Sequence, residues 1–467
     1  MIRFNKTISA ISVATLFFAI SPAAFSAVQT PITINSATPQ ARADFASKLQ
    51  KYLEADDFEG ALSLFDSLSS DLASDFEILF LKASILFSAG RLDEADSLCA
   101  KLLSVQSDNL DVLELKSMIS KLRGDTKKRS AELKEILKKD PQNVQANIEL
   151  GADCALAKDY ATARKYYRTA MLKDPKNTDA LFGYGQTSYY TGDIASAKNT
   201  FNQMLKVDPK NASAHAYLGK LAAEDENYRE AENYIVKAVE YDPNNYDYRL
   251  DYGTYAKRRG KADLAEEQWK IAVEIRPDYF LAYSYLASLY DEQSRFDEEL
   301  LQWKKVAETN PKYFYAYEAL GILYWQKGEY INSRNNFLRA ASYNPKNESY
   351  PLMVAATYYR QNEKDSYQKC KKYLDTVLKN FRENKAVYAV MRMFWENGGG
   401  VNAEAAAARA VKAETNKTTR GKLYFYLALF YDTKGSRSIA EEYYSQVTNI
   451  AAPLFFEFRL AEWGAGE

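Results

Sequence analysis

The chain has 467 residues, of which 47% are apolar and 26% are charged, and these values are typical of a folded protein with a sizeable core. Its 61 Lys and Arg residues are balanced by 62 Asp and Glu residues. Because nucleic-acid binding relies on a positively charged surface that releases counterions, this balance argues against DNA or RNA as a partner.

The first 26 residues have the pattern of a secretory signal peptide. Arg3 and Lys6 precede an apolar run from residue 8 to residue 20, and small residues follow at Ala24 and Ser26. The run is shorter than the roughly 20 residues that a membrane-spanning helix needs. We therefore expect cleavage near residue 27 and a periplasmic, envelope-associated or secreted protein, with retention as an N-terminal anchor as the alternative. Residues 27–41 hold two prolines and no charge, which predicts a flexible leader.

Prolines recur every 34 residues through the middle of the chain, mostly within segments such as KDPKN and VDPKN. A fixed period of this length predicts a repeated structural unit. The prolines at this spacing are Pro141, Pro175, Pro209, Pro243, Pro277, Pro311 and Pro345. If each proline closes a unit, the units begin at residues 42, 76, 110, 144, 178, 212, 246, 280, 314 and 348.

Each unit is predicted to be a hairpin of two helices. The eighth residue is small in most units, as at Gly219, and so is the twentieth, as at Ala231, with large apolar residues between them at helical spacing. A glycine inside a helix costs about 1 kcal/mol relative to alanine, so its recurrence indicates a close approach of the neighbouring helix. The proline lacks an amide hydrogen and disfavours the α conformation of the preceding residue, and it therefore ends the second helix.

The repeat resembles the tetratricopeptide repeat family, whose 34-residue unit carries Leu-Gly, aromatic residues, alanines and a proline in a fixed order. Residues 216–222 (AYLGKLA) and 228–243 (YREAENYIVKAVEYDP) match that order closely. The match is strong over 144–347 and weaker over 42–143, where Ser107 replaces the proline and Arg129 replaces a small residue. The resemblance implies an all-α fold, a right-handed α-α superhelical solenoid of about twelve hairpins whose first helices line a concave groove.

The C-terminal part departs from the period. In the units of 348–454, an insertion of about three residues brings 369–378 into the second-helix position. A degenerate unit follows from residue 385, and a clear unit returns at 421–454. Residues 455–467 are predicted to contain a terminal helix that caps the last unit, although its aromatic residues also suit a docking surface.

No residue pattern predicts catalysis, a cofactor or a metal. His215 is the only histidine and falls in a large-residue core position, which removes most metal-site and catalytic-triad arrangements. Cys99, Cys154 and Cys370 are far apart, and all fall at apolar helical positions, so we predict buried core residues rather than a disulfide. The GGG segment at 398–400 lacks the Lys-Ser/Thr ending of a phosphate-binding loop and is interpreted as a turn. We therefore expect a non-enzymatic protein.

The 36 tyrosines are the main sign of a binding surface. About half fall in core positions, but others fall with polar residues on a strip of the first helices beside the core. Aromatic rings flanked by mixed polar groups suit partner binding, although such rings also suit simple cover for a tight superhelix interior. The predicted partner-binding residues are Gln186, Tyr189, Tyr190, Tyr217, Lys220, Asp251, Thr254, Tyr285, Tyr315, Trp325 and Tyr359. Lys257, Ser288, Asp291 and Gln326 lie on the same strip.

These observations favour an exported scaffold or assembly factor of a bacterial cell envelope that binds a protein or peptide in the groove. Relatives that hold the C-terminal carboxylate of cytosolic chaperones use a Lys at the fifth residue of a unit, and no unit has one here. A cochaperone is therefore disfavoured. The alternative is a polysaccharide-binding accessory of an envelope export or secretion system, in which the tyrosines would stack on sugar rings.

Overall fold

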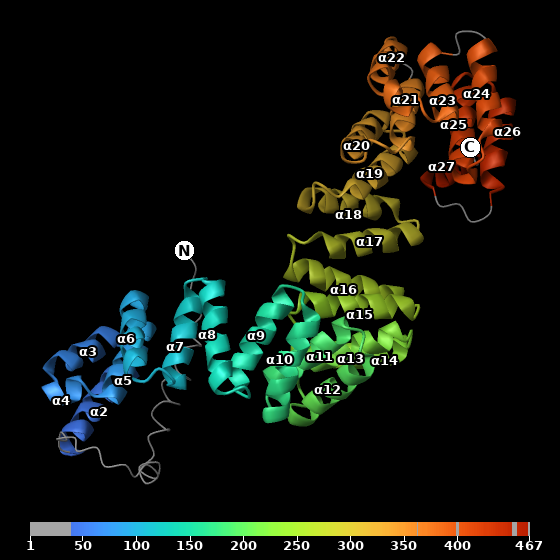
Figure 1. Cartoon of the computed structure of the whole chain (residues 1–467). Coiled ribbons are helices and arrows are strands. Elements are labelled where there is room, and N and C mark those ends of the chain that lie inside the picture. Colours follow the sequence, from blue (N-terminus) through green and yellow to red (C-terminus); the bar gives the residue numbers. More distant parts are fainter. Residues whose placement is uncertain (1–38, 362, 398–400, 451–454, 466–467) are drawn as a thin grey trace. The chain divides into compact units, whose positions relative to one another are not determined.

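The computed structural model describes residues 39–361, 363–397, 401–450 and 455–465, and these residues form helices joined by short turns (Figure 1). Across these ranges no strand is present. The predicted signal peptide, most of the leader and the GGG segment lie outside the described residues. No helix among the described residues is long and apolar enough to cross a membrane. The chain divides into two compact units, Met1–Leu218 and Gly219–Glu467, called here the N-terminal and C-terminal units.

Helices in both units follow one another as hairpins. The N-terminal unit contains α2 (Pro39–Glu54), α3 (Phe58–Ser63), η2 (Leu64–Ser67), α4 (Ser70–Ala73), α5 (Phe76–Ser88), α6 (Leu92–Val105), α7 (Leu110–Leu122), α8 (Thr126–Lys139), α9 (Val144–Leu156), α10 (Tyr160–Lys173), α11 (Thr178–Tyr190) and α12 (Ile194–Val207). Helix α13 (Ala212–Glu224) contains the boundary between the two units.

The C-terminal unit continues the pattern. It contains α14 (Tyr228–Tyr241), α15 (Tyr246–Arg258), α16 (Ala262–Ile275), α17 (Phe280–Glu292), α18 (Phe296–Thr309), α19 (Phe314–Gln326), α20 (Tyr330–Tyr343), α21 (Ser349–Gln361), α22 (Ser366–Val377), η3 (Leu378–Phe381), α23 (Lys385–Glu396), α24 (Val401–Ala413), α25 (Lys417–Thr433), α26 (Arg437–Thr448) and α27 (Phe456–Ala465). Counted over the described ranges, twelve hairpins precede α27, which confirms the predicted helical solenoid.

Eight consecutive first helices begin at the residues that the proline period predicts, from Phe76 of α5 to Phe314 of α19. Asparagine side chains cap several of these helices, and Asn143 and Asn177 each accept a hydrogen bond from the amide three residues on. Aspartates cap second helices in the same way, as Asp159 and Asp193 do. These side chains satisfy amides that have no partner within the helix, and they fix where each helix starts.

The turn inside each of the first nine hairpins contains one residue in the left-handed conformation. This residue recurs every 34 positions from Asp56 to Gly328, and five of the nine are glycine. A left-handed residue after a helix lets its terminal carbonyls accept hydrogen bonds from the following amides. The nine residues are Asp56, Gly90, Gly124, Lys158, Gly192, Glu226, Gly260, Ser294 and Gly328.

The small eighth residues make room for a large side chain of the second helix. A Cβ atom added at Gly253 would lie 2.4 Å from Nε1 of Trp269, and one added at Gly321 would lie 2.8 Å from Cε2 of Phe337. At Gly219 the nearest atom would instead be the carbonyl oxygen of Ala231, at 3.3 Å. The close approach predicted from the glycines is therefore present, but at most positions the approaching group is an aromatic ring rather than a helix backbone.

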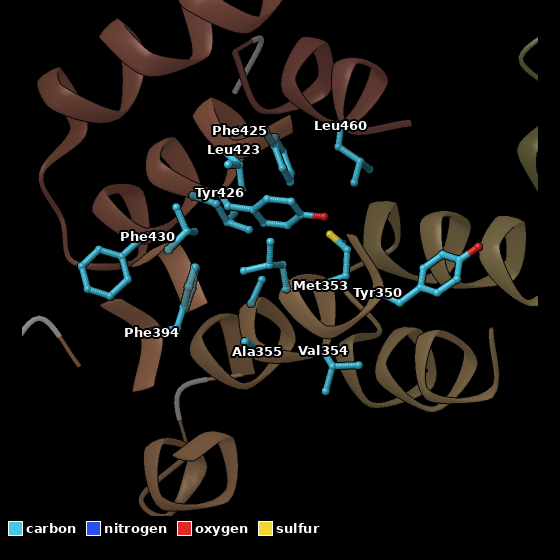
Figure 2. Close-up of a cluster of buried hydrophobic side chains, with 14 of the residues drawn as sticks. Tyr350, Met353, Val354, Ala355, Phe394, Leu423, Phe425, Tyr426, Phe430 and Leu460 are labelled. Atoms are coloured by element: carbon cyan, nitrogen blue, oxygen red, sulfur yellow. The ribbon is translucent and has the colours of Figure 1, made fainter. Parts of the chain in front are cut away.

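The C-terminal unit has a large apolar core in which α21, α23, α25 and α27 meet (Figure 2). Tyr426 lies within it, and its hydroxyl group contacts the Ser349 carbonyl at 3.0 Å and Glu457 Oε1 at 2.9 Å. Here α21 contacts α25, so a helix packs against the hairpin after next. In this part of the chain, hairpins therefore do not stack only on their immediate neighbours.

The cysteines are free thiols, as expected. Cys99 and Cys370 are fully buried, and burial raises the pKa of these thiols to about 11 and about 12 respectively. Cys154 is only half-buried, because its position on α9 is at the margin of the core, so the prediction of a buried residue is wrong for this cysteine.

Candidate functional site: a partner-binding surface

Four of the predicted residues meet in the N-terminal unit, on α11 and α13. Gln186 Nε2 donates a hydrogen bond to the hydroxyl oxygen of Tyr217 at 2.6 Å. The ring of Tyr189 is edge-on to the rings of Tyr190 and Tyr217, with centroids 5.3 and 5.8 Å away. We call Gln186, Tyr189, Tyr190 and Tyr217 the tyrosine cluster.

The tyrosine cluster combines buried and exposed rings. Tyr217 stacks on the buried ring of Phe201, with centroids 4.8 Å apart, so the core side chain holds the Tyr217 ring in one orientation. At the other end, Tyr190 is 50% exposed and stacks on Tyr160 at 4.7 Å. Aromatic rings held in place in this way lose little conformational freedom when a partner covers them.

Three further predicted residues meet in the C-terminal unit, and each comes from a different hairpin. Lys220 lies on α13, Asp251 on α15 and Tyr285 on α17. Lys220 Nζ is 3.7 Å from Asp251 Oδ2. The ring of Tyr285 is 37% exposed and lies 5.3 Å from the buried ring of Trp269. We call Lys220, Asp251 and Tyr285 the acid–lysine patch.

Asp251 has an unusual environment for a carboxylate. Burial raises its pKa to about 6 and the nearby charge of Asp247 adds to this, while Lys220 acts in the opposite direction. Its Oδ2 atom is buried, and its partner there is the ammonium group of Lys220 at 3.7 Å, which is longer than an ordinary hydrogen bond. A buried carboxylate oxygen with one long ion pair would gain from a closer hydrogen-bond donor on a ligand.

The other predicted residues do not join either group. The Thr254 hydroxyl donates to the Leu250 carbonyl of its own helix at 2.8 Å. Tyr315 is 51% exposed at the start of α19, where it lies against Phe314. Trp325, near the end of α19, is edge-on to Tyr330.

Tyr359 lies in a different environment from the one that the strip predicted. Its hydroxyl donates to the Phe394 carbonyl at 2.6 Å, and its ring packs against the rings of Phe394 and Phe430. The cause is the altered stacking at α21, which brings α23 and α25 over the surface that a regular solenoid would leave open. Within the described structure Tyr359 is a packing residue.

The predicted binding residues do not include a row of aromatic rings at the starts of α17 and α19. Tyr279 and Phe280 lie 6.0 Å apart, Phe280 and Tyr313 lie 5.2 Å apart, and Tyr313 continues to Tyr315 at 5.6 Å. Tyr279 is partly exposed. The sequence carried a signal for this row, because PDYFLAY at 277–283 and PKYFYAY at 311–317 repeat the same aromatic pair after the proline.

Family models of the tetratricopeptide repeat match the chain over more than half of its length. One matches residues 155–221, a second matches 49–108, 218–269 and 250–314, and a third matches 314–347. The chain belongs to the tetratricopeptide repeat family. Proteins of this family bind protein or peptide partners, so the fold supports a protein-interaction scaffold, and such scaffolds are typically non-catalytic.

Among solved structures, the chain is similar to the C-terminal part of a tetratricopeptide repeat protein from Cytophaga hutchinsonii, at 17% identity over 52% of this chain and 99% of that chain, with a TM-score of 0.41. It is similar to PilF from Pseudomonas aeruginosa, at 16% identity over 45% of this chain and 94% of that chain, with a TM-score of 0.40. It is also similar to YrrB, described as having an unusual peptide-binding site, at 20% identity over 40% and 96% of the two chains, with a TM-score of 0.34. No match is found among curated proteins.

Proposed function

We propose that this chain is an exported scaffold or assembly factor of the bacterial cell envelope that binds a protein or peptide segment on its first helices. The observation that carries the proposal is the acid–lysine patch, because three successive hairpins contribute one side chain each to it. A surface of this kind is suited to an extended partner that crosses several repeats. Polysaccharide binding, the alternative from the sequence, has no support in the family assignment.

The chemistry of the patch favours a peptide with a hydrogen-bond donor next to an apolar side chain. Asp251 Oδ2 is the acceptor for an amide or a cationic group, and the partly exposed ring of Tyr285 lies beside it as an apolar contact. The pKa of Tyr285 is raised, first by burial and then by the charge of Asp251. The ion pair between Lys220 and Asp251 is long, at 3.7 Å, so Lys220 can instead contact a carboxylate or carbonyl group of the partner.

Site-specific crosslinking tests this proposal in cells. A photoreactive phenylalanine analogue is placed at Tyr285 and, as a matched control, at Tyr343, which lies on the second helix α20 and is 39% exposed. We expect a discrete adduct from position 285 that is absent from position 343 and is lost in an Asp251→Lys background. Equal adducts from both positions, or an adduct that survives Asp251→Lys, would contradict partner binding at the patch.

Export is tested separately, by fractionation and N-terminal sequencing of the protein. We expect the mature chain to begin near residue 27 and to be recovered from the periplasmic or outer envelope fraction, because the apolar run of the first 26 residues is too short to remain as a span. Recovery of the Met1 form from the membrane alone would identify an uncleaved anchor. Recovery from the cytoplasm would overturn the export proposal.

A further inference from the structure

Helix α27 makes contacts far from the hairpin that precedes it. A cap on the last hairpin was predicted, and α27 does pack on α25 and α26, but it also contacts α19. Its Arg459 forms an ion pair with Asp291 of α17 at 2.5 Å, and its Phe456 ring lies 5.8 Å from Phe337 of α20. In a solenoid each repeat packs on its neighbours only, so the contacts of α27 with α17, α19 and α20 go beyond those of a cap on the last hairpin.

The group that Arg459 contacts is an acidic pair, Asp291 and Glu299. Asp291 belongs to the strip of first-helix residues that the sequence marked as a binding surface. Glu299, on α18, stands in the twentieth position of its unit, where most other units have alanine. A carboxylate at a position that favours a small apolar residue lowers stability, so its presence points to a role other than packing.

Glu299 is buried and only partly satisfied. The residue is 3% exposed, and its Oε1 atom accepts a hydrogen bond from Trp303 Nε1 at 3.1 Å. Its Oε2 atom accepts no hydrogen bond from the described residues and points toward Arg459, whose Nη2 atom is 3.8 Å away. Burial and the charge of Asp291 raise the pKa of Glu299 to about 7. A cation placed closer to this carboxyl group would therefore stabilise its charged form.

Aromatic rings flank the guanidinium group of Arg459. Its Cζ atom lies 5.2 Å from the ring centroid of Phe296 and 4.5 Å from that of Trp463. The two rings are edge-on to each other at 5.7 Å. The carboxylates of Asp291 and Glu299 and the ring of Phe296 therefore surround the guanidinium group of Arg459. Such an arrangement is expected at a site that recognises arginine rather than lysine.

We propose that Asp291, Glu299 and Phe296 form a recognition site for an arginine-bearing amphipathic helix of a partner protein, and that α27 is the resident helix that this partner displaces. The partner helix carries an arginine with an aromatic residue one turn away, as Arg459 and Trp463 do in α27. This site shares no residue with the acid–lysine patch, although Tyr285 of the patch is also on α17, and it does not depend on the proposed function of that patch.

The test uses the full-length chain and a fluorescein-labelled peptide with the sequence of residues 455–465, followed by fluorescence anisotropy. In the wild-type chain the tethered α27 competes at an effective concentration in the millimolar range. The Arg459→Glu variant places a carboxylate against the acidic pair and releases α27, so we expect it to bind the peptide at least tenfold more tightly than wild type. Adding Asp291→Asn and Glu299→Gln to that variant is expected to abolish the gain.

A peptide that carries Arg459→Glu is the matched control, and it is expected to bind neither chain. Hydrogen exchange of residues 456–465 reports the release of α27 directly, and Arg459→Ala serves as a milder variant if Arg459→Glu does not fold. Equal binding of both peptides, equal affinity in wild type and variant, or unchanged protection of α27 in both Arg459 variants would each overturn the proposal. Binding that survives loss of the acidic pair would show that α27 is held by apolar packing alone.

Discussion

His215 Nε2 lies 3.1 Å from the carbonyl oxygen of Pro209, six residues before it. The same contact recurs in other hairpins, where the carbonyl of the closing proline meets the fourth residue of the next first helix. Tyr283 donates to the Pro277 carbonyl and Tyr317 to the Pro311 carbonyl, both at 3.1 Å. The only histidine of the chain is therefore one member of a repeated structural hydrogen bond, in agreement with the core role expected for it.

Replacing His215 should show what this hydrogen bond contributes. We expect His215→Leu to lower the free energy of unfolding by about 1 kcal/mol, because the hydrogen bond between the buried imidazole and the Pro209 carbonyl is lost. His215→Tyr should cost less than half as much, because tyrosine makes the same bond in two later hairpins. Urea denaturation of both variants and wild type measures the difference, and equal losses for Leu and Tyr would contradict the assigned hydrogen bond.

Gly253 faces an aromatic ring and Gly219 faces a backbone carbonyl, so replacement by alanine should affect the stability of the two positions differently. Gly253→Ala should destabilise by about 1 to 3 kcal/mol, because the new methyl group would overlap the Trp269 ring, which is 2% exposed. Gly219→Ala should be close to neutral, because a contact of 3.3 Å needs only a small shift and alanine favours the helix by about 1 kcal/mol. Thermal unfolding of the two variants distinguishes them, and similar melting temperatures would show that the ring can move aside.

Two of the left-handed turn residues, Ser294 and Gly260, can be substituted in opposite directions as a matched pair. Ser294 has a φ of 57°, and Gly260 has a φ of 75° at the same place in the preceding hairpin, with no atom within 4 Å of an added Cβ. Ser294→Gly should raise the free energy of unfolding by about 1 kcal/mol, and Gly260→Ser should lower it by a similar amount, because only glycine adopts this conformation without steric cost. Chemical denaturation gives both values, and changes of the same sign would indicate that contacts rather than backbone strain dominate these turns.

The sequence predicted the regular hairpins because their signals are local. The proline that ends one helix, the asparagine that caps the next and the glycine beside an aromatic ring all act within a single unit, so the starts of α5 to α19 could be located from the period alone. The same phase placed Lys220 and Asp251 on one face, and their charged groups lie 3.7 Å apart.

The C-terminal arrangement could not be predicted in this way. Contacts of α21 with α25 and of Arg459 with Asp291 join segments that are several hairpins apart, and no period in the sequence encodes them. The packing of Tyr359 could not be predicted for the same reason, because its ring contacts Phe394 of α23 and Phe430 of α25 rather than residues of its own hairpin. A solenoid can be predicted one unit at a time only where each unit packs on its neighbours.

The raised pKa of Asp251 leads to a pH-dependent stability. Burial raises this pKa from 3.8 to about 6, so between these values the folded state binds the proton that the unfolded state has lost. Linkage then requires that stability falls as the pH rises through this interval, by an amount on the order of 2 kcal/mol. Asp251→Asn should therefore be stabilised relative to wild type by about 2 kcal/mol more at pH 7.5 than at pH 4.5, as measured by urea denaturation at both values.

Glu266 provides the control of opposite sign. Hydrogen bonds from Arg295, Lys270 and Tyr290 lower its pKa to about 2, so its stabilising contribution is present above pH 4.5 and is lost only as the pH falls toward 2. Glu266→Gln should destabilise the chain by nearly the same amount at pH 4.5 and pH 7.5. If the stability difference between Asp251→Asn and wild type is likewise independent of pH, Asp251 is solvated, and its carboxylate does not lower the folding stability as proposed for a ligand-binding group. If it follows the expected slope, the acid–lysine patch retains a carboxylate at the expense of folding stability, as expected for a residue selected for binding.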